Sequence, residues 1–179
     1  MATKPEEYTL GSGLLYVAVY DATVGIPGDT ELEVADNILG YIQGGASLKY
    51  EPETYEVADD LGYVKETLLT KETVTLTSGL LTWNGNTLKT LVGTARVEED
   101  TANSIRTTKI GGLANYVNEK YVIRFVHANN GKKVTIVGNN AAGFEFAFNP
   151  TKETVVNVEF NAGSLDSDGT LVIFTEPIL

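Results

Sequence analysis

Short runs that alternate apolar and polar residues, separated by Gly, Asn and Asp, recur along this 179-residue sequence. Strict alternation is the period of a β-strand, and the separating residues favour turns. Residues 72–77 alternate cleanly, so we expect Val74 and Leu76 to face a core. Residues 14–20 are apolar on both faces and predict a buried central strand. The chain is therefore expected to bury its apolar surface mainly through β-sheets.

Other segments show a similar β-strand pattern and predict further strands. They lie at 40–50, 104–110, 121–126, 134–137, 144–148, 155–160 and 171–174. Asn129, Asn130 and Gly131 predict a hairpin turn between the third and fourth of these segments. The pair Gly44-Gly45 predicts a β-bulge in the first segment. A turn at 166–169 is expected to join the last two.

One short helix is predicted after residue 86. Asn86 can cap it, the apolar residues at 88, 91 and 92 form one stripe, and Gly93 can end it. A second helical turn is expected within 113–119. One short helix among so many strands implies a mainly β fold, with two packed antiparallel sheets in a sandwich or barrel and a single flanking α-helix.

The length suits one domain spanning residues 1–179. Residues 1–12 are expected to form an extended N-terminal arm. Residues 22–38 and 51–62 have no clear period and are expected to be long loops. Loops of this length inside a compact domain are usually functional, so both are candidate interface segments.

The charge balance constrains the partners of the chain. Thirteen Lys and Arg residues stand against 24 Asp and Glu, which leaves a net charge of −11. Such a chain repels phosphate, so we expect no tight electrostatic binding to nucleic acid or to anionic membranes. The longest apolar run is too short to cross a bilayer, and the first seven residues lack the apolar core of a signal peptide. Synthesis in a cytoplasm is expected.

Enzymatic chemistry finds no support in the sequence. There is no cysteine, and the single histidine, His127, precedes the turn at Asn129 and is expected to lie on the surface. Asp166 and Asp168, followed by Gly169, resemble the start of a calcium loop, but the remaining ligands are missing. No metal or cofactor site is expected, and no catalytic residue is assigned.

The order and spacing of several segments resemble those of phage major tail tube proteins, whose fold is shared with the type VI secretion tube. The segments are LGYIQGGASLKYEP at 39–52, YEVADDLG at 55–62, LLTWN at 80–84, VVNVEFNA at 155–162 and DGTLV at 168–172. The resemblance covers roughly residues 14–175. It implies a non-enzymatic structural subunit of a virion tail.

The resemblance further implies hexameric rings that stack into a hollow tube and conduct DNA during ejection. Each subunit would give four strands to a closed inner barrel, place its helix outside and send loops into the next ring. A barrel of about 24 strands is roughly 50 Å across its backbone, which leaves room for a duplex. An acidic lumen would not bind the passing phosphates. The partners implied are further copies of the chain, tape-measure, tail-terminator and baseplate or tip proteins, and a sheath where one surrounds the tube.

Two sets of residues are assigned to this assembly. The acidic loop is the candidate contact between rings, through Glu51, Pro52, Glu53, Tyr55, Glu56, Asp59 and Asp60. The most polar strands are candidates to line the lumen, through Glu66, Thr70, Glu72 and Thr107.

Two alternatives stay open. The same tube subunit serves in phage-derived bacteriocins and injection systems. A monomeric β-sandwich that binds a surface ligand is the rival of a different class, and it would show an exposed Trp or Tyr on a concave face. The only tryptophan, Trp83, is instead expected to pack beneath the helix.

Overall fold

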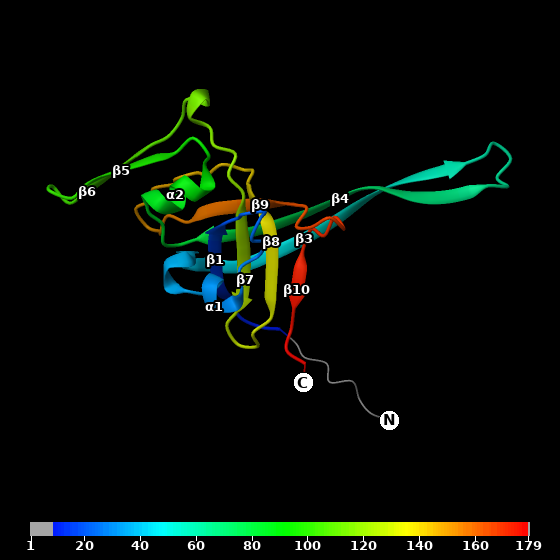
Figure 1. Cartoon of the computed structure of the whole chain (residues 1–179), viewed down its shortest axis with the longest axis horizontal. Coiled ribbons are helices and arrows are strands. Elements are labelled where there is room, and N and C mark those ends of the chain that lie inside the picture. The colour runs from blue at the N-terminus through cyan, green and yellow to red at the C-terminus, as the bar shows by residue number, and fades with distance from the viewer. Residues whose placement is uncertain (1–8, 179) are drawn as a thin grey trace.

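The chain consists of a β-rich body from which two hairpins project on different sides (Figure 1). The computed structural model describes residues 9–178, so most of the extended N-terminal segment expected at 1–12 lies outside the described residues. The strands are β1 Gly13–Val19, β2 Ile38–Gly40, β3 Ile42–Ala58, β4 Lys65–Leu80, β5 Arg96–Asp100, β6 Ile105–Lys109, β7 Tyr121–His127, β8 Lys133–Asn140, β9 Val156–Gly163 and β10 Ile173–Thr175. The helices are α1 Asp29–Leu32 and α2 Gly85–Leu91, with 3-10 turns η1 Ala35–Asn37 and η2 Leu113–Asn115.

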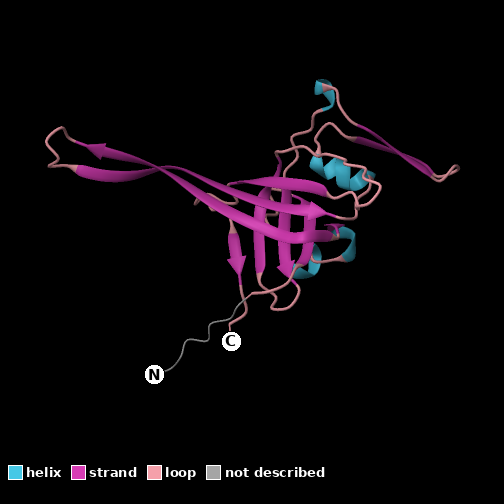
Figure 2. Ribbon diagram, turned by 180° about the vertical axis from the view of Figure 1, so that it is seen from behind, coloured by secondary structure: helices cyan, strands magenta, loops and turns pink. Residues whose placement is uncertain are grey.

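Two packed layers are built from one antiparallel sheet. Its strand order is β2-β1-β7-β8-β9-β4-β3, and β10 adds to β8. The strands β1, β7 and β8 run steeply across β9, β4 and β3 (Figures 1 and 2). The core between the layers takes side chains from both of them, including Leu15, Ile123, Ile136, Val74, Leu76, Val158 and Phe160. The expected fold class is confirmed, and the described chain closes no barrel by itself.

The two layers are joined at β8. Residues 133–138 of this strand pair with β7, and residues 137–140 pair with β9. Where the two pairings overlap, Gly138 faces Ala162 so closely that a Cβ on Gly138 would stand 1.9 Å from the Asn161 carbonyl oxygen. Only a residue without a side chain allows this approach.

The helix α2 begins two residues earlier than expected. Asn84, not Asn86, is its cap, because the Asn84 Oδ1 accepts from the backbone N–H groups of Asn86 at 2.8 Å and Thr87 at 3.3 Å. Leu88 and Leu91 are buried, as their spacing predicts. A cap needs an extended backbone, which Asn84 has and a residue already inside the helix does not.

Residues 51–62 are not a loop, contrary to expectation. β3 continues to Ala58 and β4 starts at Lys65, so only the tip between them is a turn. Proline and acidic residues are rare in strands and concealed this one. Pairing with β4 overrides that propensity, and cross-strand ion pairs such as Glu53 with Lys71 accompany it.

Residues 144–148 form no strand, although they alternate. They lie across the body, where the Phe146 ring stacks on Trp83 with a centroid distance of 4.3 Å, while Phe148 is exposed. Aromatic stacking, not a β-ladder, orders this segment, and Trp83 packs on Phe146 and the core. The last strand also differs from expectation, since β10 pairs with β8 and not with β9.

The segment 22–38 is a structured connection and not an irregular loop. It contains α1 and η1, and Leu32 is fully buried against Val122 and Val137. The chain therefore has a second helix, α1, in addition to α2. It could not be predicted from the sequence, because four residues are too few to show a helical period.

An ion cluster fastens α1 to the outer face of β7 and β8. The buried Arg124 contacts Asp29 at 2.7 Å and Glu33 at 3.1 Å, and Lys133 contacts the same two carboxylates at 2.7 and 2.6 Å. The Lys133 hydrogen bond lowers the pKa of Asp29 most, with its charge and that of Arg124 adding to the effect. Burial alone would lower the pKa of Lys133, but the hydrogen bonds to Asp29 and Glu33 outweigh it and raise the pKa.

We expect Gly138→Ala to lower the free energy of unfolding by an amount near the top of the roughly 1–3 kcal/mol range for overpacking, because its Cβ meets backbone. Urea denaturation followed by the fluorescence of the single Trp83 measures the change. Gly28→Ala is the matched control, since Gly28 has a negative φ and open space, and it should change stability by less than about 0.5 kcal/mol. Equal losses of unfolding free energy in the two variants would contradict the role of Gly138 in the close contact between β8 and β9.

We expect Asp29→Asn to cost no more than about 1 kcal/mol at neutral pH, because the carboxylate is exposed and Arg124 keeps Glu33. The pKa of Asp29 is depressed, so its contribution is present above its ordinary value of 3.8 and lost as the pH falls through the folded pKa. The difference between wild type and variant should therefore shrink in thermal melts as the pH falls below 3.8, and vanish once Asp29 is protonated in the folded state. Asp36→Asn, which removes an exposed carboxylate with no ion pair among the described residues, should show no such pH dependence.

Candidate assembly surfaces

The longest exposed feature is the outer part of the β3–β4 hairpin, residues 51–72, which we call the arm. Every residue from 47 to 72 is exposed, and the arm extends away from the body as a two-stranded ribbon (Figures 1 and 2). An isolated two-stranded hairpin is at best marginally stable in water. The arm therefore lacks the third strand or the packed face that would stabilise it within one chain.

The arm carries apolar as well as charged side chains. Its ion pairs join Lys71 to Glu53 at 2.9 Å and Lys65 to Glu56 at 3.1 Å, all exposed and therefore weak. Its exposed apolar side chains are Tyr55, Val57, Leu61, Tyr63, Val64, Leu68 and Leu69. A cluster of exposed apolar groups of this size marks a contact surface.

The arm collects most of the residues that the sequence assigns to assembly. The seven candidates for the contact between rings lie on β3 and at the tip. Glu66, Thr70 and Glu72 lie on β4 of the same hairpin, where Glu66 faces Val57 and Glu72 faces Pro52. Thr70 occupies a bulge between them, which turns Glu66 and Glu72 to opposite faces of the ribbon.

Thr107 lies apart from the other lumen candidates. It is on β6 and faces Glu98 of β5, in the second projecting hairpin. There, Lys109 contacts Glu98 and Arg106 contacts Glu99, both at 2.7 Å. The structure thus divides the predicted lumen residues between two hairpins, and their lumen position stays a prediction.

Apart from Tyr55, the apolar residues of the arm were not identified from the sequence. Leu61, Tyr63 and Val64 surround the tip, and Leu68 and Leu69 follow them along β4. The sequence did contain a signal, because a loop with this many large apolar residues needs a partner surface to cover them. The acidic residues between the apolar ones concealed that signal.

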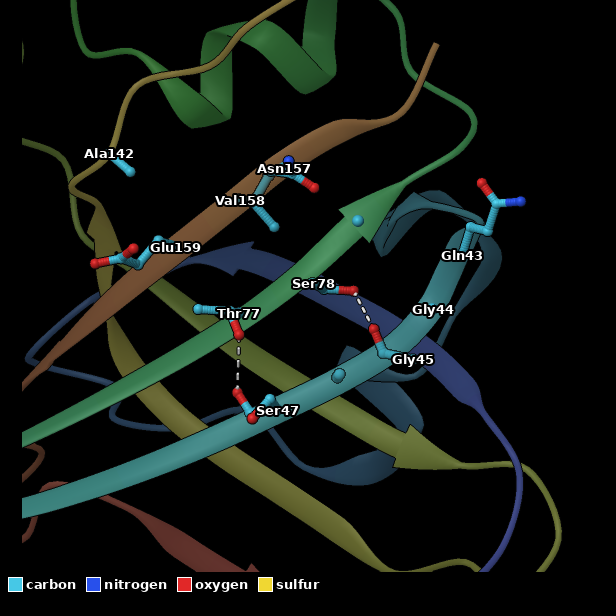
Figure 3. A pocket seen from close by; sticks show the side chains of 12 residues that line it. Gln43, Gly44, Gly45, Ser47, Thr77, Ser78, Ala142, Asn157, Val158 and Glu159 are labelled. Carbon is cyan, nitrogen blue, oxygen red and sulfur yellow. Dashed lines mark hydrogen bonds between the residues drawn. The ribbon is translucent and has the colours of Figure 1, made fainter. Parts of the chain in front are cut away.

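A hollow lies in the body, at the end of the β3–β4 hairpin opposite the arm, where β3, β4 and β9 meet (Figure 3). Its volume is about 400 Å³, and Gly44 and Gly45 form one wall in the expected bulge with φ of +82° and +78°. The Ser78 hydroxyl donates to the Gly45 carbonyl at 2.9 Å. Glu159 is the single charged residue of this lining, so the hollow offers no constellation for acid–base or metal chemistry.

A second hollow lies beside α2. Gly93 brings the chain around Val117 against the end of this helix, because the Val117 N–H donates to the Gly93 carbonyl at 2.9 Å. The resulting cleft of about 210 Å³ is lined by Lys89 and Leu91 of α2 and by Tyr116, Val117 and Glu119. The Tyr121 hydroxyl donates to Glu119 at 2.8 Å, and burial followed by this carboxylate raises the pKa of Tyr121.

His127 is buried, so the expectation of a surface histidine is wrong. Its exposed fraction is 4%, and neither ring nitrogen has a hydrogen-bond partner among the described residues. The segment at Gly11 covers it, since a Cβ there would stand 3.4 Å from Nε2. Nothing in its described surroundings makes it part of a catalytic pair.

Two further features of residues 9–178 concern other classes of site. Within that range, no helix combines the length and apolarity needed to cross a membrane. The same residues bring together no group of three or more His, Asp or Glu side chains suited to a metal ion.

Comparison with solved structures finds components of tail-like particles. The tube-terminating cap of the anti-feeding prophage is 12% identical over 99% of this chain and 100% of that one, with a TM-score of 0.50. A chain from the tail of an empty gene transfer agent particle is 11% identical over 91% of this chain and 95% of that one, with a TM-score of 0.47. No protein-family model matches the chain. No curated protein matches it by sequence. The likeness concerns the fold, and the chain therefore has a phage tail tube-like fold.

Proposed function

We propose that this protein is a non-enzymatic structural subunit of a phage-type tail tube, assembling with further copies of itself into stacked rings. The observation that carries the proposal is the exposed, apolar arm on a tail tube-like fold. A surface of this kind is a liability for a monomer and is useful to a subunit that buries it in an assembly. The particle is a virion tail made in a host cytoplasm, or a domesticated bacteriocin or injection system.

Ring formation is supported by the open ends of the sheet. The path ends at β2 on one side and at β3 on the other, and within residues 9–178 the only strand that pairs with β3 is β4. Unpaired edge strands are templates for pairing with another chain. We propose that neighbouring copies pair along these edges to close the inner barrel, with six copies per ring as the tail tube resemblance implies.

Stacking is assigned to the arm, which reaches beyond the body and carries Glu51, Glu53, Glu56, Asp59 and Asp60 among its apolar residues. The net charge of −11 supports a lumen that does not retain DNA. Glu66, Thr70, Glu72 and Thr107 remain the candidates for its wall. The tape-measure, tail-terminator and baseplate proteins and a surrounding sheath are the further partners proposed.

A tube-terminating cap is a second candidate, because the similarity to the prophage cap extends over nearly the whole of both chains. A cap forms one ring and stops, whereas a tube subunit continues to stack. Electron microscopy of the concentrated protein separates the two, since only the tube subunit gives particles of increasing length. A protein that stays monomeric in size-exclusion chromatography would instead be a β-sandwich binding module.

We expect the arm to be required for stacking and dispensable for folding. Replacing residues 53–71 by Asn-Gly joins the paired Pro52 and Glu72 through a two-residue hairpin turn. The variant should keep the thermal unfolding transition of the body, because the arm adds little to the core, and should form no tubes by electron microscopy.

The matched control removes only charge, from the β5–β6 hairpin instead of the arm. Glu98→Gln combined with Lys109→Gln deletes one exposed ion pair, which contributes at most about 1 kcal/mol, and should leave tubes intact. Long tubes from the shortened protein would show that another element stacks the rings.

A further inference from the structure

We infer that the tip of the arm docks in the α2 cleft of a second copy of this chain, with Tyr63 as its anchor. The inference rests on the proposed function and names the two surfaces that meet. The tip comprises residues 59–64, and the α2 cleft is the hollow lined by Lys89, Leu91 and Val117.

The tip presents its apolar side chains in a fixed turn. The Asp59 carboxylate accepts from the Val64 N–H at 2.8 Å, and the Asp59 N–H donates to the Val64 carbonyl at 3.1 Å. The turn leaves Leu61 76% and Tyr63 85% exposed. An aromatic residue held outward by a rigid turn loses little conformational entropy when it binds, which is the property of an interface anchor.

The cleft provides a complementary surface. Leu91 lies in it, Tyr116 and Val117 form an exposed apolar wall, and Asn140 closes it by donating to the Leu91 carbonyl at 3.2 Å. Its volume of about 210 Å³ suits one side chain rather than a strand or a helix. Lys89 and the Glu119 carboxylate add the polar groups that a tyrosine hydroxyl needs when its ring is buried.

Charge complementarity identifies the occupant as another copy. Among the described residues, the bases without an ion pair are Lys89, Arg96, Lys120 and Lys152. Lys89 lines the cleft, while Arg96 and Lys120 directly follow lining residues in the chain. The arm carries a matching acid, because Asp60 at the tip has no ion pair with a described base.

The positions of the two surfaces exclude docking within one chain. The arm leaves one side of the body, and α2 with the second hairpin lies at the other end (Figure 1). When two different surfaces of identical chains meet in a heterologous contact, each copy keeps one free tip and one free cleft, so the contact can propagate from copy to copy. This is the geometry that an open-ended stack requires.

Chemical crosslinking between engineered cysteines tests the contact directly, because the chain contains no cysteine. A protein with Leu61→Cys and Val117→Cys, which keeps the Tyr63 anchor, should give a ladder of covalent oligomers in denaturing gels when it is treated with a short bismaleimide after assembly. Leu61→Cys with Lys89→Cys is a second pair across the same contact and should give the same ladder. Leu61→Cys with Ile173→Cys is the control and should stay monomeric, since β10 lies away from the cleft.

The outcomes separate this inference from the proposed function. Ladders from both test pairs, absent in the control, support docking in the cleft. Tubes visible by electron microscopy without a ladder from either test pair overturn the docking site and leave the tube function standing. A protein that forms neither rings nor tubes at any concentration overturns both.

Discussion

The whole fold depends on one strand, β8, whose two ends pair with strands of different layers. β8 bonds to β7 over its first six residues and to β9 over its last four, so a single sheet turns over and becomes two layers. Gly138 makes the turn possible, because the backbone of Asn161 occupies the space that a side chain would need. The core forms between these layers, and α2 and the aromatic stack of Trp83 with Phe146 then cover the flank of that core.

The arm follows from the same sheet, because β3 and β4 are longer than the body they cover. Leu76 and Leu80 are buried where β4 pairs with β9, and beyond Thr73 the ribbon continues with every residue exposed. Its exposed apolar side chains and the free edge of β3 leave surface that one chain cannot bury. Assembly with other copies satisfies both requirements, which is why the arm and the open edges point to the same kind of function.

Local patterns predicted most of the body and failed where partners decide the structure. The hairpin of β7 and β8, the glycine bulge and the inward face of β4 were all visible as alternation and turn residues. Acids and a proline favour a loop over residues 51–62, yet pairing with β4 makes residues 51–58 a strand. Residues 144–148 show the opposite error. They alternate perfectly but form no strand, because no described strand pairs with them.

By itself the sequence determined the β-rich class, the position of the main helix, the acidic charge and the lack of cysteine, because each depends on composition or on neighbouring residues. Only the tertiary structure decided that the ring-contact candidates share one arm with Glu66 and Glu72, that a bulge at Thr70 turns those two apart, and that His127 is buried. Register, bulges and burial depend on which distant segments meet, and the alternation within one strand carries no information about its partner.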